Sequence, residues 1–325
     1  MKAKAKPTRK PEWLRMKLPG GDKVHEIKSR LREKKLFTVC EEARCPNLGE
    51  CWSQGTATLM ILGDTCTRGC RFCNVKSGNP RGWLDPLEPQ KAAESVVAMD
   101  LNYVVITCVD RDDLPDGGAG QFAAVIREVQ RVKPDCLVEV LASDYAGVHE
   151  HIATVADAGP DVFAHNVETV KRLTPTVRDP RAGYQQSLDV LAYVKEREPE
   201  RITKSSLMLG LGETRHEIVE TFADLRRHGV DVVTLGQYLR PSRKHLEVVE
   251  YLAPERFDAL ADEARRMGFL YVAAGPMVRS SYKAGEYFLA NHIARQKAYR
   301  VRGQENPPTA SGQVHDSLAD LPFSV

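Results

Sequence analysis

Six of the eight cysteines in this chain fall in two tight groups. The first group is spaced C-x4-C-x5-C and the second C-x3-C-x2-C; the residues are Cys40, Cys45 and Cys51, then Cys66, Cys70 and Cys73. Three thiols on one short loop with no fourth thiol nearby suit a four-iron cubane that keeps one iron free. The spacing therefore predicts two metal clusters, of which the second has an iron available for chemistry.

The composition bears on the environment of these thiols. The chain has 325 residues with 42% hydrophobic content, enough for one large α/β domain or two ordinary ones. It has no run of eighteen apolar residues, and its N-terminus lacks the apolar core of a secretory signal. We expect a soluble cytoplasmic protein that does not act at a membrane, in which close thiols bind metal rather than form disulfides. A zinc site is the alternative for the second group, but structural zinc sites are closed by four ligands.

The N-terminal residues 1–35 are strongly basic. They carry thirteen Lys or Arg against four Asp or Glu, a net +9, so residues 36–325 sum to −7 in a chain of net charge +2. Two interpretations stay open for this leader: it docks an acidic protein partner, or it is a solvated, partly disordered segment. No aromatic residues are interleaved in a way that favours nucleic acid, and we expect no nucleic-acid partner.

Strand-like and helix-like segments alternate through the rest of the chain. Expected barrel strands lie at 57–62, 103–107, 137–141, 161–165, 202–209 and 230–235, and a further short strand is expected at 269–273. Expected helices lie at 91–99, 121–132, 145–158, 185–198, 213–228 and 254–267. Such repetition requires parallel strands, and no dinucleotide fingerprint follows the first strand. We therefore predict an α/β fold, a partial TIM-type (β/α)6 barrel with N-terminal and C-terminal extensions. The expected divisions are a leader at 1–35, an N-terminal extension at 36–56, the barrel at 57–253, a C-terminal extension at 254–302 and a flexible tail at 303–325.

The second cysteine group directly follows the first expected strand, where barrel enzymes keep their catalytic residues. Its spacing, with Phe72 before the last cysteine, resembles the signature of the radical S-adenosylmethionine (SAM) superfamily. The resemblance implies that Cys66, Cys70 and Cys73 hold a catalytic [4Fe-4S] cluster. Such a cluster binds SAM, whose cleavage yields a carbon radical able to take hydrogen from an unactivated C–H bond.

The two cysteine groups together with Arg279-Ser280-Ser281-Tyr282 resemble the lipoyl synthase family, with similarity from about Phe37 to Tyr282. The resemblance implies an auxiliary [4Fe-4S] cluster on Cys40, Cys45, Cys51 and one serine, which we take as Ser280, with Ser281 still open. It also implies a sulfurtransferase that inserts two sulfurs, at C6 and C8, into an octanoyl chain amide-linked to a lysine, with the auxiliary cluster as sulfur donor. Without the resemblance, this serine pair would be read as a surface turn.

The same resemblance implies several partners. The carriers are lipoyl domains of 2-oxoacid dehydrogenase E2 subunits and the glycine cleavage H protein. An electron donor such as ferredoxin or flavodoxin and an iron-sulfur cluster carrier are also expected. Two alternatives remain: another radical SAM enzyme with an auxiliary cluster, or a non-catalytic metal-binding module whose basic leader binds an acidic partner.

Residues near the ends of the expected strands are candidates for contacts with SAM. They are Thr107, Asn166, Glu168, Lys204 and Arg240. Asn166 and Glu168 suit ribose hydroxyls or the amino acid end of SAM, although helix capping by Asn166 is an equal alternative. Lys204 is expected either to pair with an anionic group or to extend to the barrel rim. Cys108 and Cys136 are expected to be small buried side chains.

Overall fold

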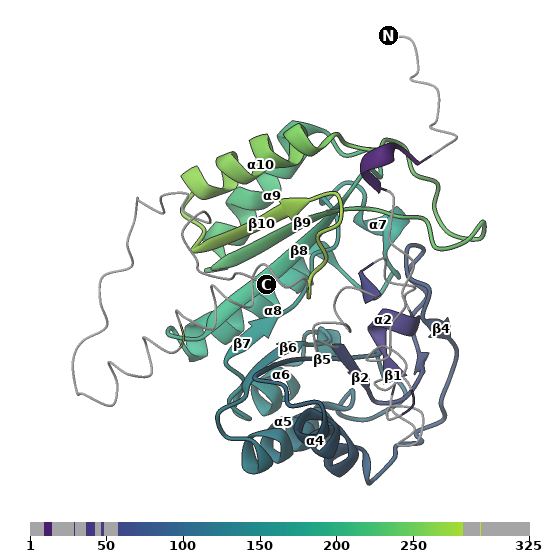
Figure 1. The fold of residues 1–325 in the computed structure, drawn as a ribbon, viewed down its shortest axis with the longest axis vertical. Coiled ribbons are helices and arrows are strands. Elements are labelled where there is room, and N and C mark those ends of the chain that lie inside the picture. Colours follow the sequence, from purple (N-terminus) through teal and green to yellow (C-terminus); the bar gives the residue numbers. More distant parts are fainter. Residues whose placement is uncertain are drawn as a thin grey trace, which may run out of the picture.

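A mostly parallel eight-stranded sheet lies at the centre of the part of the chain that the computed structural model describes, residues 10–14, 29, 37–42, 47–48, 58–281 and 293 (Figure 1). Its order is β1-β2-β5-β6-β7-β8-β9-β10, with neighbours parallel from β2 to β10 and β1 antiparallel to β2. The strands are β1 (Phe37–Thr38), β2 (Thr58–Ile61), β5 (Tyr103–Cys108), β6 (Leu137–Leu141), β7 (Val162–Ala164), β8 (Ile202–Leu209), β9 (Val232–Gln237) and β10 (Tyr271–Gly275).

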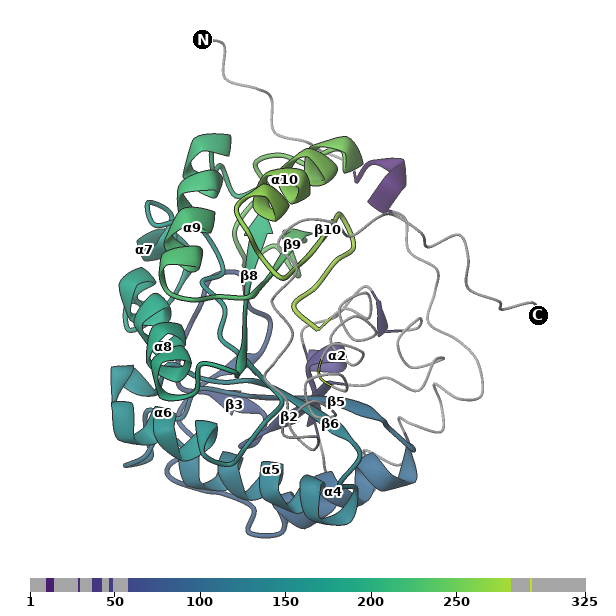
Figure 2. The same ribbon diagram turned by 90° about the vertical axis from the view of Figure 1, so that its left-hand side faces the viewer.

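Helices follow the strands in turn and cover the outer face of the sheet. They are α4 (Glu88–Ala98), α5 (Ala119–Val132), α6 (His149–Ala156), α8 (Tyr184–Arg197), α9 (Arg215–Arg227) and α10 (Pro254–Arg266), with the short α2 (Val39–Glu42), α7 (Thr174–Val177), η1 (Glu12–Leu14) and η2 (Tyr145–Gly147). Figure 2 shows α4, α5, α6, α8 and α9 in an arc around the strands. Since β1 and β10 are the sheet edges, the barrel is open between them.

Alternation along the strands separates a helix-facing core from the barrel interior. In β5, Val104 and Ile106 belong to the main core with Phe122 of α5, whereas Val105 belongs to a separate cluster with residues of β7, β8 and β9. Because side chains alternate between the two faces of a strand, Thr107 shares the interior face with Val105. The end of β5 therefore presents a hydroxyl to the interior of the barrel.

Local sequence signals explain where the helices begin. Thr214 forms a capping box at the start of α9, since its side chain accepts from Glu217 N and the Glu217 carboxylate accepts from Thr214 N. Pro254 occupies the first turn of α10, where a missing N–H leaves no intrahelical bond unmade. These signals set the length of the loops that lead from the strand ends to the helices.

The structure confirms the predicted α/β fold, the six predicted barrel strands close to their expected bounds, and the short strand expected at 269–273. One prediction needs correction: α10 and β10, which the sequence places in a C-terminal extension, continue the barrel. Tyr271 of β10 pairs in parallel with Val232 of β9, and Gly275 with Gly236. The sheet thus gains a seventh parallel strand, and residue 253 does not mark a break in it. None of the helices in the described ranges is long and apolar enough to cross a membrane.

Candidate active site

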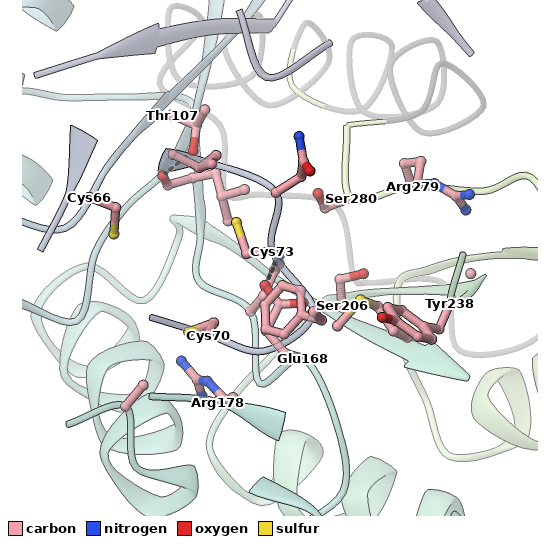
Figure 3. Close-up of a pocket in the computed structure, with 18 of the residues that line it drawn as sticks. Cys66, Cys70, Cys73, Thr107, Glu168, Arg178, Ser206, Tyr238, Arg279 and Ser280 are labelled. Atoms are coloured by element: carbon pink, nitrogen blue, oxygen red, sulfur yellow. Dashed lines mark hydrogen bonds between the residues drawn. The ribbon is translucent and has the colours of Figure 1, made fainter. Parts of the chain in front are cut away.

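A cavity of about 550 Å³ lies at the carboxyl ends of the parallel strands. Most of the candidate residues line it: Cys66, Cys70, Cys73, Thr107, Asn166, Glu168, Arg240 and Ser280. Figure 3 shows the three cysteines, Thr107, Glu168 and Ser280 around this space. Parallel strands that end at one edge bring together residues far apart in sequence, and this edge is where such folds bind ligands.

The second cysteine group lies on a loop that a short parallel ladder closes. β3 (Thr65–Cys66) pairs with β4 (Lys76–Ser77), so that Cys66 lies opposite Ser77. Farther along the loop, His245 Nε2 lies 2.9 Å from Cys73 O, and Leu246 N donates to Arg71 O at 3.2 Å. The pairing of β3 with β4 thus closes the loop, and the two hydrogen bonds connect it to the segment that follows β9.

The three thiols are partly shielded from water. Burial raises the pKa of Cys66 to about 12, of Cys70 to about 11 and of Cys73 to about 12. Binding of a metal by these thiols would therefore release protons. Two sulfurs accept backbone hydrogen bonds, Cys66 Sγ from Arg68 N at 3.4 Å and Cys70 Sγ from Asp179 N at 3.3 Å. Such bonds stabilise cysteine sulfurs that carry the negative charge of an iron ligand.

Glu168 forms part of the opposite wall in a strained conformation. Its φ of 66° is in the left-handed region, which a residue with a side chain rarely adopts. Hydrogen bonds to β8 hold it there: Glu168 N donates to Ser206 O at 3.0 Å, and Met208 N donates to Glu168 O at 2.9 Å. Asn166 Nδ2 also donates to Glu168 Oε1 at 3.1 Å, so Asn166 orients this carboxylate rather than capping a helix.

Two buried polar atoms at this wall lack hydrogen-bond partners among the described residues. They are Asn166 Oδ1 and Arg178 Nε, and both residues line the cavity. Removal from bulk water raises the pKa of Glu168, and the nearby Arg178 partly offsets this effect. Buried polar groups are normally paired, so a free acceptor and a free donor here indicate a polar ligand. With Glu168 and Arg178 the wall offers both charges, which suits a ligand that carries an ammonium and a carboxylate.

Two other predicted residues line the cavity, and the side chain of each donates a hydrogen bond to a backbone carbonyl oxygen. Thr107 Oγ1 donates to Leu141 O at 3.1 Å, which leaves its lone pairs able to accept. Arg240 Nε donates to His245 O at 2.9 Å, so this side chain stabilises the segment after β9 whose His245 ring contacts Cys73 O.

The structure does not bring Lys204 to the cavity, contrary to prediction. Its ammonium forms a 2.7 Å ion pair with Glu139, and Tyr103 also donates to that carboxylate at 2.6 Å. The side chains of Lys204 and Glu139 are 4% and 2% exposed. Lys204 lies on the interior face of β8, two residues before the cavity-lining Ser206, and is therefore deeper in the barrel.

The C-terminal motif also reaches the cavity. Ser280 and Ser281 both line it. The segment before them passes so close to β9 that a Cβ on Gly236 would lie 2.1 Å from Val278 O. Asn47, in the region of the first cysteine group, donates to Met277 O at 2.7 Å. Asn47 and the segment that leads to the serine motif are thus neighbours in space, although 230 residues separate Asn47 from Met277.

The first cysteine group is described in part. Cys40 lies in α2, and Asn74, next to Cys73, donates to Glu42 O at the end of this helix at 2.7 Å. Cys45 and Cys51 lie outside the described residues. That the three thiols share a cluster stays a prediction.

Sequence reasoning missed several cavity residues. Arg178 follows the short helix α7 in an irregular segment, where no period or motif marks it. Arg68 has one local signal, since it lies between the first two cysteines of the loop. Cys108, expected to be a buried small side chain, lines the cavity, whereas Cys136 is buried in the main core as expected.

Comparisons with known proteins agree with this geometry. Residues 60–225 match the radical SAM superfamily, and residues 1–45 match the N-terminal domain of lipoyl synthase of that family. A lipoyl synthase from Myxococcus xanthus is 55% identical over 294 residues, covering 90% of this chain and 98% of the relative. The chain belongs to the lipoyl synthase family of radical SAM enzymes. Lipoyl synthase from Ectopseudomonas mendocina is 54% identical over 91% of this chain and 85% of its own, and mitochondrial lipoyl synthase from Aedes aegypti is 53% identical over 94% and 78%.

Solved structures share the fold at low sequence identity. HydG, a maturase of the [FeFe]-hydrogenase, superposes with a TM-score of 0.50 at 15% identity, covering 78% of this chain and 55% of HydG. Streptococcus suis SuiB bound to its precursor peptide SuiA gives 0.51 at 9% identity over 77% and 52%. Lipoyl synthase membership therefore rests on sequence, and these structures support the barrel architecture.

Proposed function

We propose that this enzyme inserts two sulfur atoms, at C6 and C8, into an octanoyl chain amide-linked to a lysine of a lipoyl carrier domain. The main support is the convergence of Cys66, Cys70 and Cys73 with the Ser280 segment on one cavity. A radical generator and a sulfur source must reach the same carbon atoms, and this arrangement meets that requirement. Apolar side chains of the cavity, among them Met60 and Leu141, suit an alkyl chain.

The residues of the cavity fit SAM and a [4Fe-4S] cluster. Cys66, Cys70 and Cys73 would hold the cluster, which with SAM supplies a radical able to take hydrogen from an unactivated C–H bond. The Glu168 carboxylate would bind the ammonium of SAM and the Arg178 guanidinium its carboxylate. Asn166 Oδ1, which lacks a partner among the described residues, would accept from a ribose hydroxyl.

A second cluster would be held by Cys40, Cys45, Cys51 and Ser280, and would serve as sulfur donor. A serine oxygen is a harder and more basic ligand than a thiolate, so protonation can release it from iron. The Asn47 contact with Met277 supports this ligand set, because it joins the region of the first cysteine group to the segment that leads to Ser280.

The partners follow from the proposed reaction. The substrates would be octanoylated E2 lipoyl domains and the glycine cleavage H protein. A one-electron donor such as ferredoxin or flavodoxin would reduce the Cys66, Cys70 and Cys73 cluster, and a cluster carrier would rebuild the spent one. The location proposed is the cytoplasm; the family also includes relatives named as mitochondrial and apicoplast enzymes.

An iron and sulfide count on protein assembled without oxygen tests the cluster inventory. Two cubanes require about eight of each per chain. About four of each would exclude the second cluster, and zinc without sulfide would exclude the reaction.

Two matched variants separate the proposed roles. Cys70→Ala should abolish SAM cleavage to 5′-deoxyadenosine, because the reductive cluster loses a ligand. Cys45→Ala should retain cleavage yet form no lipoyl product when given an octanoyl-lysyl peptide. Lipoyl product from Cys45→Ala would contradict the donor role, and another radical SAM reaction would then have to be sought by substrate screening.

A further inference from the structure

Aspartates and arginines alternate in a series of ion pairs that includes Arg68, on the loop between the first two cysteines of the second group. Its members, here called the Asp–Arg chain, are Asp144, Arg68, Asp112, Arg181 and Asp179. Arg68 Nη1 and Nη2 bind the Asp144 carboxylate at 2.6 and 2.7 Å, and Arg68 Nη2 binds Asp112 Oδ1 at 2.9 Å. Arg181 continues the chain, with Nη1 3.2 Å from Asp112 Oδ2 and Nε 2.8 Å from Asp179 Oδ1. The five residues thus connect the loop to the segments after β5, β6 and α7.

The Asp179 end of this chain holds the loop backbone directly. Asp179 Oδ2 accepts from Gly69 N at 2.8 Å, and Arg181 Nη2 donates to Thr67 O at 2.8 Å. In return, Asp179 N donates to Cys70 Sγ at 3.3 Å. Each segment therefore donates to the other, and the position of the sulfur depends on both.

The two ends of the Asp–Arg chain differ in their exposure to solvent. This difference determines at which residue the role of the Asp–Arg chain can be tested. The side chains of Arg68 and Asp144 are 3% and 0% exposed, so removing either would leave an uncompensated buried charge. The Arg181 side chain is 49% exposed and that of Asp179 only 9%. Asp179 thus has a shielded carboxylate, while its partner Arg181 is exposed enough for water to replace the lost contact. A substitution of Asp179 leaves the buried pair of Arg68 and Asp144 intact.

We propose that Asp179 is a positioning residue that sets the reduction potential of the cluster on Cys66, Cys70 and Cys73 by holding its own N–H against the Cys70 sulfur. Hydrogen bonds to cluster sulfurs stabilise the reduced, more negative state and raise the potential. The carboxylate acts through geometry, because its bond to Gly69 N fixes the distance between the two backbone segments. This inference rests on the proposed assignment of that cluster.

The sign of the potential shift in Asp179→Ala distinguishes positioning from simple charge. Loss of a nearby negative charge alone would raise the midpoint potential, because the reduced cluster would be repelled less. Loss of the Gly69 contact would loosen the N–H···S bond and lower the potential. We expect a lower midpoint potential in Asp179→Ala, measured by redox titration of the electron paramagnetic resonance signal that changes when SAM is added.

Asp179→Asn provides the rescue. Its amide oxygen can still accept from Gly69 N while the charge is gone, so the potential should be equal to or above that of the unsubstituted protein. Asp157→Ala is the matched control, since Asp157 forms a similar two-bond pair with Arg197, at 2.7 and 2.8 Å, away from the cavity. Its potential, spectrum and iron content should not change.

A raised or unchanged potential in Asp179→Ala, with full iron, would overturn the proposal. If Asp179→Ala fails to retain iron, full iron in Asp179→Asn would support the acceptor role, and equal loss in both variants would overturn it. A parallel Cys70→Ala sample separates this inference from the cluster assignment. If that variant keeps the SAM-responsive signal, the assignment itself fails, whatever Asp179 does.

Discussion

At the scale of single residues, the site contains two charged side chains, Glu168 and Arg178, that are shielded from bulk water and oriented to bind a charged ligand. Glu168 is oriented by Asn166 and held in a strained backbone conformation by β8. Arg178 Nη1 donates to Ser187 Oγ at 2.7 Å, which fixes the guanidinium while Nε has no partner among the described residues. Strain and an unmade hydrogen bond both cost folding free energy, and a bound ligand offsets the second.

Replacing Glu168 by Gln should weaken SAM binding without removing iron. A hydrogen bond to a charged group contributes about 1.5–3 kcal/mol, so we expect the KM for SAM to rise roughly tenfold or more. Steady-state formation of 5′-deoxyadenosine measures this, with the exposed Glu150→Gln as control. An unchanged KM for Glu168→Gln would show that its carboxylate does not contact SAM.

The sequence predicted those cavity residues that stand in a motif or directly after a strand. The cysteines have a diagnostic spacing, and Asn166 and Glu168 follow β7. Lys204 was misplaced although the bounds of its strand were predicted correctly, because it lies near the amino end of β8, whereas the cavity lies at the carboxyl ends of the strands. Arg178 could not be predicted, because it reaches the cavity through the packing of an irregular segment.

At the scale of elements, the close approach of the C-terminal segment to β9 positions the serine motif. Gly236 has no side chain at the point where Val278 O crosses it, and an added Cβ would lie 2.1 Å from that oxygen. The neighbouring Gly275 is paired with Gly236 across the sheet, yet a Cβ there would be at 3.4 Å from a Val278 methyl group. A Cβ atom therefore fits at Gly275 but not at Gly236.

Gly236→Ala should displace the Ser280 segment and reduce the iron content from about eight to about four per chain, with the SAM-responsive signal retained. Overpacking of this kind also destabilises by about 1–3 kcal/mol. Gly275→Ala is the matched control and should keep its full iron. Iron analysis with spectroscopy checks both, and full iron in Gly236→Ala would contradict the role of this crossing.

Strand-helix repetition made the barrel predictable, since each buried strand is a short apolar run followed by an amphipathic helix. The sequence predicted the strand β10 but not that it belongs to the barrel sheet. Its residues pack on α10 and β9 like those of any other barrel strand, but the serine motif directly after it suggested a separate extension. Which sheet a terminal strand joins depends on tertiary contacts that its own sequence does not encode.

At the scale of the whole molecule, the fold partly shields the three sulfurs of the second cysteine group from bulk water. Burial raises the pKa of all three thiols of the second group, from an ordinary 9.0 to about 11 or 12. The folded state thus retains protons that the unfolded chain releases above pH 9, so stability is lost as pH rises through this range.

The iron-free protein should accordingly lose unfolding free energy between about pH 9 and pH 11, by up to about 1.4 kcal/mol per pH unit for each thiol. The variant with Cys66→Ser, Cys70→Ser and Cys73→Ser should lose less, because serine does not titrate there. Urea unfolding without oxygen at several pH values measures the difference. Parallel pH dependence of the two proteins would contradict the shift.

The central claim is that the sulfide of the auxiliary cluster, which the chain's own cysteines and serine would hold, is transferred to the product. It is tested most directly by assembling the clusters with a heavy sulfur isotope and allowing one turnover with an octanoyl-lysyl peptide, SAM and reductant. Mass spectrometry of the peptide should show a dithiolane that carries the heavy isotope. Formation of 5′-deoxyadenosine with no sulfur in the peptide would contradict the account.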